Sequence, residues 1–147
     1  MTAKANDGGK LYVWTYLEST KSYAGWHLNA DRVACARLSE VIEGLSAGSL
    51  RAPQVFPVSP VTAAVLAVPN NRRAKARSAR ELRLLTDPDP RRFSLEERDD
   101  VLTISAGSER LEELRKSIVG ITQNKGDFAM TADGKRRPPD HRLWFWW

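Results

Sequence analysis

Two stretches of helical periodicity constrain the fold of this chain more than any other feature of its sequence. The first stretch, residues 29–45, starts at Asn29, a favourable helix N-cap, and the second, residues 108–121, starts at Ser108. Apolar residues recur at helical spacing in both: Ala30, Val33, Ala34, Leu38, Val41, Ile42 and Leu45 in the first, and Leu111, Leu114, Ile118 and Ile121 in the second. Each stretch therefore predicts an amphipathic helix with one buried side.

Shorter apolar segments around these helices are predicted to be strands, because they alternate with period two or end at turn residues. They are residues 11–17, 54–58, 81–86, 100–105, 127–131 and 141–147. Residues 61–68 fit either a short helix opened by Pro60 or a buried strand, and we favour the helix. Strand, helix, strand and strand thus follow one another in that order twice along the chain.

This order predicts an α+β fold, with a mainly antiparallel sheet and two principal helices on one face. The repetition adds the hypothesis of a tandem βαββ arrangement. The chain of 147 residues has the size of one domain, and no Gly/Ser-rich linker divides it. We therefore expect a single domain over residues 10–147, preceded by a disordered N-terminal tail over residues 1–9.

The composition is that of a globular protein, with 41% hydrophobic and 28% charged residues. Prolines interrupt the longest uncharged apolar stretch, residues 55–71, which is also shorter than a membrane-spanning helix requires. Residues 1–10 are polar and do not resemble a secretory signal. The single cysteine, Cys35, excludes an internal disulfide and any multi-cysteine metal site. We expect a cytoplasmic protein without a membrane partner.

The net charge of +5 comes from one short segment, residues 72–92, which holds eight Lys or Arg residues against three Asp or Glu. Arginine is suited to bidentate contact with phosphate and carboxylate groups. The candidate residues for binding nucleic acid or another anion are Arg72, Arg73, Lys75, Arg77, Arg80, Arg91 and Arg92. A solvated loop is the alternative interpretation, because the acid-rich residues 96–100 could lie alongside and cancel the field.

Aromatic residues gather near the two ends of the sequence. The aromatic cluster or interface that we predict consists of Tyr12, Trp14, Tyr16, Trp26, Trp144, Trp146 and Trp147. If the last strand pairs beside the first, these rings meet across the sheet and form part of the core. The alternative is a platform of exposed rings, such as Trp14 or Trp26, on which bases, sugars or a partner's apolar side chains stack.

The given sequence ends with an apolar run whose last residue is Trp147. A carboxylate at that position is costly to bury unpaired, so we expect Trp147 to lie at or near the surface. An exposed aromatic edge strand can pair with a second copy of itself. We therefore predict a homodimer.

Candidate catalytic groups are few, because the sequence contains none of the common nucleophile, metalloprotease or nucleotide-binding motifs. His27 could act as a general base oriented by Asp31. A metal site formed by His27 and His141 with Asp140 is a second possibility, but a structural role is the favoured interpretation. Cys35 has small apolar neighbours and is expected to be a buried, inert thiol. We assign no catalytic residue, no metal and no cofactor.

These observations favour a small, non-enzymatic binding or interaction module with an Arg-rich, anion-facing loop. Its candidate partners are nucleic acid and an acidic protein. One alternative is a ligand-binding protein or enzyme with an aromatic pocket near His27. The other is an adaptor or inhibitor that binds only protein.

Overall fold

A computed structural model of the chain describes residues 9–16, 25–67, 75–123, 128–132 and 142–146. Its helices are α1 (Arg32–Ala47), α2 (Ala63–Ala67) and α3 (Ser108–Thr122). Its strands are β1 (Leu11–Tyr16), β2 (Trp26–Ala30), β3 (Gln54–Pro57), β4 (Ala76–Ser78), β5 (Glu81–Thr86), β6 (Phe93–Arg98), β7 (Val101–Ala106), β8 (Phe128–Thr131) and β9 (Arg142–Phe145). Of the predicted tail, residues 1–8 lie outside the described residues.

The strands of the described residues form two sheets. The five-stranded sheet has the order β4-β1-β2-β9-β8, and the four-stranded sheet has the order β3-β5-β7-β6. One central pair in each sheet, β2–β9 and β5–β7, is parallel, and the other pairs are antiparallel. The α+β class and the mainly antiparallel pairing are confirmed, with the strands divided between two sheets instead of one.

The two halves of the chain repeat the same elements in the same register. The segment β1-β2-α1-β3-β5 corresponds to β6-β7-α3-β8-β9, apart from the inserted α2 and β4. In the five-stranded sheet, Val13, Leu28 and Phe145 lie opposite one another on β1, β2 and β9. The equivalent residues in the four-stranded sheet are Leu95, Ile104 and Leu84, on β6, β7 and β5. Each sheet therefore combines the first hairpin of one repeat with the last two strands of the other.

The repeat unit is therefore ββαββ. The tandem βαββ hypothesis is right for the helices and the last two strands of each half, but it matches residues 11–17 with residues 100–105, whereas the structure matches β1 with β6 and β2 with β7. Strands β2, β4 and β6 were not predicted, because residues 29 and 30 of β2 were assigned to the first helix and the other residues to connections. In β2 and β6 the polar residues alternate with apolar ones, as in a strand with one buried face. The β6–β7 hairpin closes through Asp99 and Asp100, whose φ angles of 53° and 63° fit a two-residue turn of type I′. This pair lacks the glycine that usually marks such turns.

Both predicted helix caps are wrong by one or two residues. Asn29 lies in β2, and Asp31 caps α1 by accepting a hydrogen bond from the Ala34 N–H at 2.8 Å. The N-cap of α3 is Gly107, without a side-chain cap. There the N–H of Glu109 donates to the Pro90 carbonyl at 3.0 Å, because residues 87–92 pack over the start of α3.

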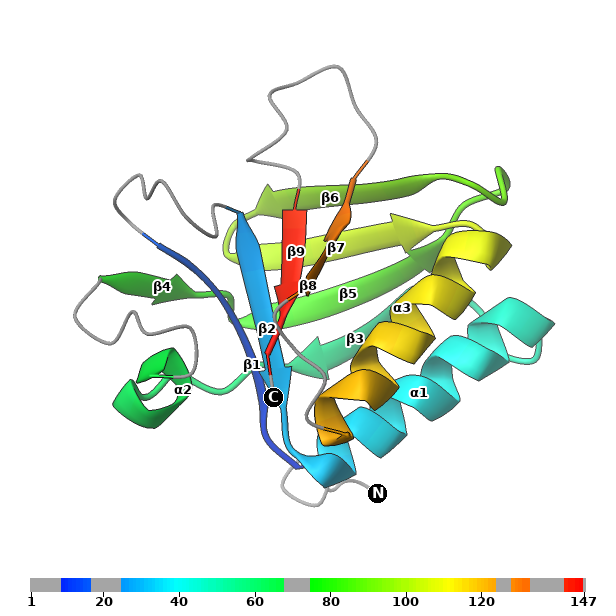
Figure 1. Cartoon of the computed structure of the whole chain (residues 1–147). Helices are drawn as coiled ribbons and strands as arrows, with labels where there is room; N and C mark the ends of the chain where they lie inside the picture. Colours follow the sequence, from blue (N-terminus) through cyan, green and yellow to red (C-terminus); the bar gives the residue numbers. More distant parts are fainter. Residues whose placement is uncertain (1–8, 17–24, 68–74, 124–127, 133–141, 147) are drawn as a thin grey trace.

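The core is formed by both sheets and both long helices. Figure 1 shows α1 and α3 side by side, running in opposite directions on the same side of the sheets. Most of both predicted buried stripes is confirmed, since Leu38, Ile42, Leu114 and Ile118 are each at most 1% exposed. Val33 was wrongly assigned to the first stripe, because its side chain in the first turn of α1 is 53% exposed, and Val41 is only partly buried. Full burial of one such side chain contributes about 1.5–3 kcal/mol. Among the described helices, none has the length and apolar character needed to span a membrane.

Two inserted elements, α2 and β4, lie between β3 and β5 in the chain. The strand β4 extends the five-stranded sheet at its edge beside β1, whereas α2 lies on the outer face of that sheet, away from the long helices (Figure 1). Val65 and Leu66 of α2 pack there against Trp14 and Trp146. No described element covers the corresponding outer face of the four-stranded sheet. The insertion therefore makes the two outer faces different.

Candidate ligand-binding groove

The candidate arginines of the basic segment that the structure describes, Arg77, Arg80, Arg91 and Arg92, lie against acidic groups. Arg77 contacts Asp100 at 3.0 Å and Glu97 at 3.4 Å, and its guanidinium lies 5.5 Å from the ring centroid of Trp26. Its neighbour Arg80 contacts Glu81 at 3.5 Å and donates to the Asp99 carbonyl at 3.2 Å. These contacts fasten β4 and the start of β5 to the β6–β7 turn.

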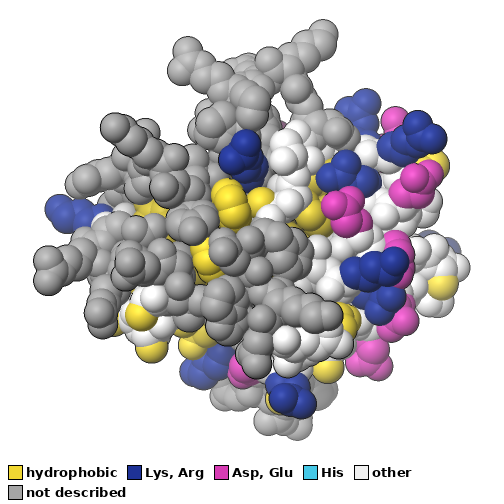
Figure 2. Space-filling model, in the orientation of Figure 1, with side chains coloured by type: hydrophobic (Ala, Val, Ile, Leu, Met, Phe, Trp, Pro, Cys, Tyr) yellow, Lys and Arg dark blue, Asp and Glu magenta, His cyan; other side chains and the backbone are white. Residues whose placement is uncertain are grey.

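The two later arginines of the set are also close to carboxylates. Arg92 lies 3.8 Å from Asp87, and Arg91 lies 4.0 Å from Glu109. Figure 2 shows Lys and Arg side chains interleaved with Asp and Glu on the side of the molecule where α3 lies. Interleaved charges weaken the local positive field. Lys75 is exposed, whereas Arg72 and Arg73 lie outside the described residues.

Several aromatic rings of the predicted set lie on the outer face of the five-stranded sheet, under α2. Trp14 and Trp146 are 0% and 2% exposed, and Tyr12, Tyr16 and Trp144 pack against them. Trp26 lies on the opposite face and is also buried. Neither Trp14 nor Trp26 is therefore exposed for base stacking, and Trp147 lies outside the described residues.

His27 is enclosed by these rings and is 0% exposed. Its imidazole stacks on Trp14 at 5.3 Å and on Trp146 at 6.1 Å, and Tyr16 meets it edge-on at 4.9 Å. The Trp146 indole N–H donates to His27 Nδ1 at 3.0 Å. Because an indole nitrogen only donates, Nδ1 carries no proton and the ring is neutral.

The predicted partner of His27, Asp31, is engaged elsewhere. Its carboxylate accepts from the backbone N–H groups of Ala34 and Lys10, both at 2.8 Å, at the start of α1. His141 and Asp140 lie outside the described residues. Within the described part of the chain, no group of three or more His, Cys, Asp or Glu side chains could hold a metal ion.

Cys35 is buried beneath a shallow groove between α1 and α3. Burial raises the pKa of its thiol from 9.0 to about 11, and the nearby charge of Asp31 adds to the shift. The thiol therefore remains protonated at neutral pH, which disfavours a nucleophilic role.

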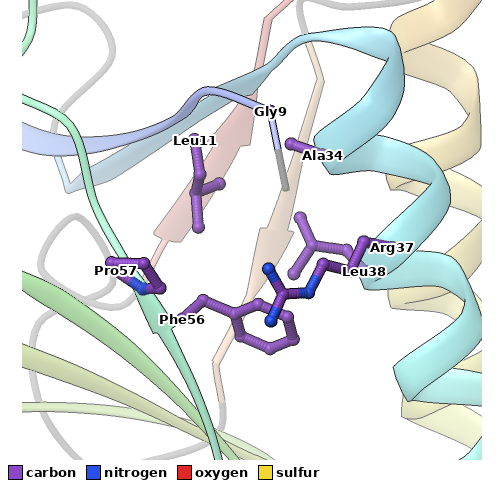
Figure 3. Close-up of a pocket in the computed structure, with 7 residues that line it drawn as sticks. All are labelled: Gly9, Leu11, Ala34, Arg37, Leu38, Phe56 and Pro57. Atoms are coloured by element: carbon purple, nitrogen blue, oxygen red, sulfur yellow. The ribbon is translucent and has the colours of Figure 1, made fainter. Parts of the chain in front are cut away.

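A small hollow lies between β1, α1 and β3 (Figure 3). Figure 3 shows the Arg37 guanidinium beside the Phe56 ring, and the two are 5.6 Å apart. The free volume of about 20 Å³ has room for about one water molecule. This hollow is too small for a ligand.

The larger candidate site is a groove of about 390 Å³ on the outer face of the four-stranded sheet. Strand alternation directs Leu82, Leu84, Leu102 and Ile104 into the core and leaves the intervening residues on this outer face. The floor of the groove is formed by β7, whose side chains here are the short Val101 and Thr103. Longer side chains of β5 and β6, including Arg83 and Glu96, form its walls.

The charged groups of this groove are only partly paired. Arg80, at one end, is held by the contacts described above. Arg83 and Arg98 line the same groove, and neither forms an ion pair with any described carboxylate. The Nε atom of Arg83 is buried and has no hydrogen-bond partner among the described residues. Guanidinium groups without carboxylate partners favour an anion in the groove that they line.

The sequence analysis did not select Arg83, Glu96 or Arg98. The alternation of residues 81–86 placed Arg83 on the polar side of its strand, which was the available signal. Glu96 and Arg98 belong to β6, so their common face was not visible without that strand. No protein-family model matches the chain, and no match was found among curated proteins or solved structures.

Proposed function

We propose that this protein is a non-enzymatic binding module that takes a small anionic ligand in the groove over β7. The observation that carries the proposal is the pair Arg83 and Arg98, two guanidinium groups in one groove without carboxylate partners among the described residues. Guanidinium groups bind carboxylates and phosphates through paired, charge-assisted hydrogen bonds. The groove volume of about 390 Å³ lies within the usual range for small-molecule sites.

Binding without chemistry is favoured because the described residues that line the groove include no histidine, cysteine or lysine, and the sequence has no common motif that would activate the hydroxyl and carboxyl groups there. Its polar groups are Thr103, three arginines and two carboxylates. The candidate base from the sequence, His27, is enclosed on the other sheet, where its Nδ1 accepts from Trp146. An enzyme would need an activated group within reach of the bound ligand.

A small ligand is favoured over a nucleic acid strand, the first candidate partner from the sequence. A strand of phosphates along this groove would meet Glu96 and Asp99, which line it together with the arginines. Arg77, Arg80, Arg91 and Arg92, the candidate arginines that the structure describes, also lie close to carboxylates. Nucleic acid and an acidic protein therefore remain alternatives for the binding test. A homodimer and a cytoplasmic location remain predictions from the sequence.

Calorimetric titration with sodium butanoate and with inorganic phosphate tests the proposal. We expect saturable binding of at least one anion at low salt. The variant R83Q should bind about tenfold more weakly, as expected for losing one charge-assisted contact. The variant R98Q should bind the anion about threefold more weakly, because the exposed side chain of Arg98 is better hydrated than that of Arg83.

The matched control is R91Q, which removes the same charge from a side chain that is 85% exposed and outside the groove. Its affinity should equal that of the wild type. The proposal fails if neither anion binds, or if R83Q and R91Q weaken binding equally. A labelled single-stranded oligonucleotide that binds more tightly than both small anions, with an affinity insensitive to R83Q, would favour nucleic acid instead.

A further inference from the structure

The groove over β7 carries charges of both signs. One row of side chains crosses it from Arg83 in β5, over Thr103 in β7, to Glu96 in β6. Two inter-strand spacings, about 10 Å, separate the backbones of Arg83 and Glu96. No ion pair joins these two side chains. A ligand lying over Thr103 would therefore have a cation on one side and an anion on the other.

The neighbouring row has its charges in the opposite order. It runs from Glu81 in β5, over Val101 in β7, to Arg98 in β6. Glu81 is already paired with Arg80, whereas Arg98 has no ion pair within the described residues. Arg83 and Arg98 thus lie on one diagonal of the groove. The carboxylate of Glu96, which forms no ion pair within the described residues either, lies beside that diagonal.

We propose, on the basis of the anion-binding function above, that the ligand also carries a cationic group and is an amino-carboxylate of amino-acid size. Its carboxylate lies between Arg83 and Arg98, and its ammonium group meets Glu96. The carbon chain lies over Thr103 and Val101, the short side chains of the floor. A ligand with one negative charge only would leave Glu96 without a partner and close to a second anion.

The internal repeat supplies independent support for an occupant over the central strand. By register, Thr103 corresponds to His27, and Arg83 and Glu96 correspond to Trp144 and Trp14. On the five-stranded sheet the imidazole of His27 fills the space over the central strand. On the four-stranded sheet the short Thr103 leaves this space open, so an external molecule can take the place of the internal ring.

Three probes of matched length test the inference by calorimetry: 4-aminobutanoate, butanoate and butylammonium. The zwitterionic 4-aminobutanoate should bind at least about tenfold more tightly than either singly charged probe, since it gains one additional charge-assisted contact. The variant E96Q should remove that advantage and leave butanoate affinity equal or higher. The control E40Q, which neutralises an exposed carboxylate on α1, should leave the advantage intact.

The variant T103H places the residue of the equivalent position in the groove. It should abolish binding of 4-aminobutanoate while the protein remains folded, because the side chain is added on an uncovered face. Equal affinities for 4-aminobutanoate and butanoate would overturn this inference and leave the anion-binding function standing. Failure of 4-aminobutanoate, butanoate and inorganic phosphate alike to bind would overturn the two proposals together. Tight binding that T103H does not change would place the ligand elsewhere and also overturn both.

Discussion

The outer faces of the two sheets occupy equivalent positions in the internal repeat but differ in almost every property. On the five-stranded sheet, Trp14, His27 and Trp144 form one row beneath α2, and the first two are fully buried. The equivalent row on the four-stranded sheet contains a glutamate, a threonine and an arginine and lines an open groove. The same backbone register thus supports a filled face and a hollow one.

The difference shows which part of the repeat the core constrains. Most inward-facing strand positions are apolar in both copies, as at Val13, Leu28, Leu95 and Ile104, because a polar residue there would lose its hydrogen bonds to water. Outward-facing positions depend on what covers them. The inserted helix α2 covers one outer face, so aromatic residues are stabilising there. Where no described element covers the face, charged residues are retained and become available for binding.

The largest expected effect comes from truncating equivalent residues on the two faces. The variant W14A should lower the free energy of unfolding by about 3–5 kcal/mol, because it empties a buried site. The variant E96A, at the equivalent exposed position, should change it by less than about 0.5 kcal/mol. Urea denaturation of both variants measures the contrast. Similar losses would show that the four-stranded face is also packed, against this account.

A slightly smaller effect is expected from exchanging the central residues of the two rows. The variant H27T should lower the free energy of unfolding by about 2–3 kcal/mol, because the Trp146 indole N–H loses its acceptor and a cavity is left. The reverse exchange, T103H, should cost less than about 0.5 kcal/mol. Urea denaturation gives both values, and the Trp146 indole signal in a ¹H–¹⁵N spectrum should shift only in H27T. Similar losses of unfolding free energy in H27T and T103H would contradict the distinction between a filled face on the five-stranded sheet and an open face on the four-stranded sheet.

The two long helices differ in how their stability depends on pH. Cys35 in α1 and Leu111 in α3 occupy equivalent positions, because the backbone N–H of each donates to the carbonyl of its N-cap residue, Asp31 or Gly107. Because folding raises the pKa of the Cys35 thiol from 9.0 to about 11, the unfolded chain loses its thiol proton more readily. Stability should therefore fall as the pH rises from 9 to 11, by on the order of 2 kcal/mol. The variant C35A should lose less stability than the wild type between pH 9 and 11, as measured by urea denaturation at both pH values. An equal loss in C35A would show that other groups cause the pH dependence.

The smallest contrast is between two arginines of the basic segment. R77A should cost about 1 kcal/mol, because Arg77 joins the sheets through two carboxylates and the Trp26 ring. R91A should be neutral, since that side chain is 85% exposed with a long contact to Glu109. Thermal unfolding at low and high salt measures both. A neutral R77A would mean that the sheets are held together without this contact.

The helices and most strands were predictable because their apolar periodicity reflects burial directly. Leu38, Ile42, Leu114 and Ile118 occupy the positions that helical spacing assigned to the core. The division into two sheets was not predictable, because it depends on which strands pair across the two halves. Because β2 was not predicted, its parallel pairing with β9, which joins the two ends of the chain, could not be predicted either.

The candidate groove was less accessible to sequence reasoning than the fold. Density of charge along the chain pointed to residues 72–92, yet the paired carboxylates there come from other elements, such as Asp100 and Glu109. Arg83 lies inside that segment and Arg98 outside it, and the two stand out only because they line a common groove and lack carboxylate partners among the described residues. Spatial pairing of charges, and not their count along the chain, decides which arginines are available.

The most direct test of the central claim is a ¹H–¹⁵N titration of the labelled protein with 4-aminobutanoate. The account predicts saturable shifts in the backbone signals of Arg83, Thr103 and Glu96 and around the β6–β7 turn. The signals of Trp14 and His27, at equivalent positions beneath α2, should not move. Shifts confined to those aromatic positions, or none at all, would contradict the assignment of the open face as the binding site.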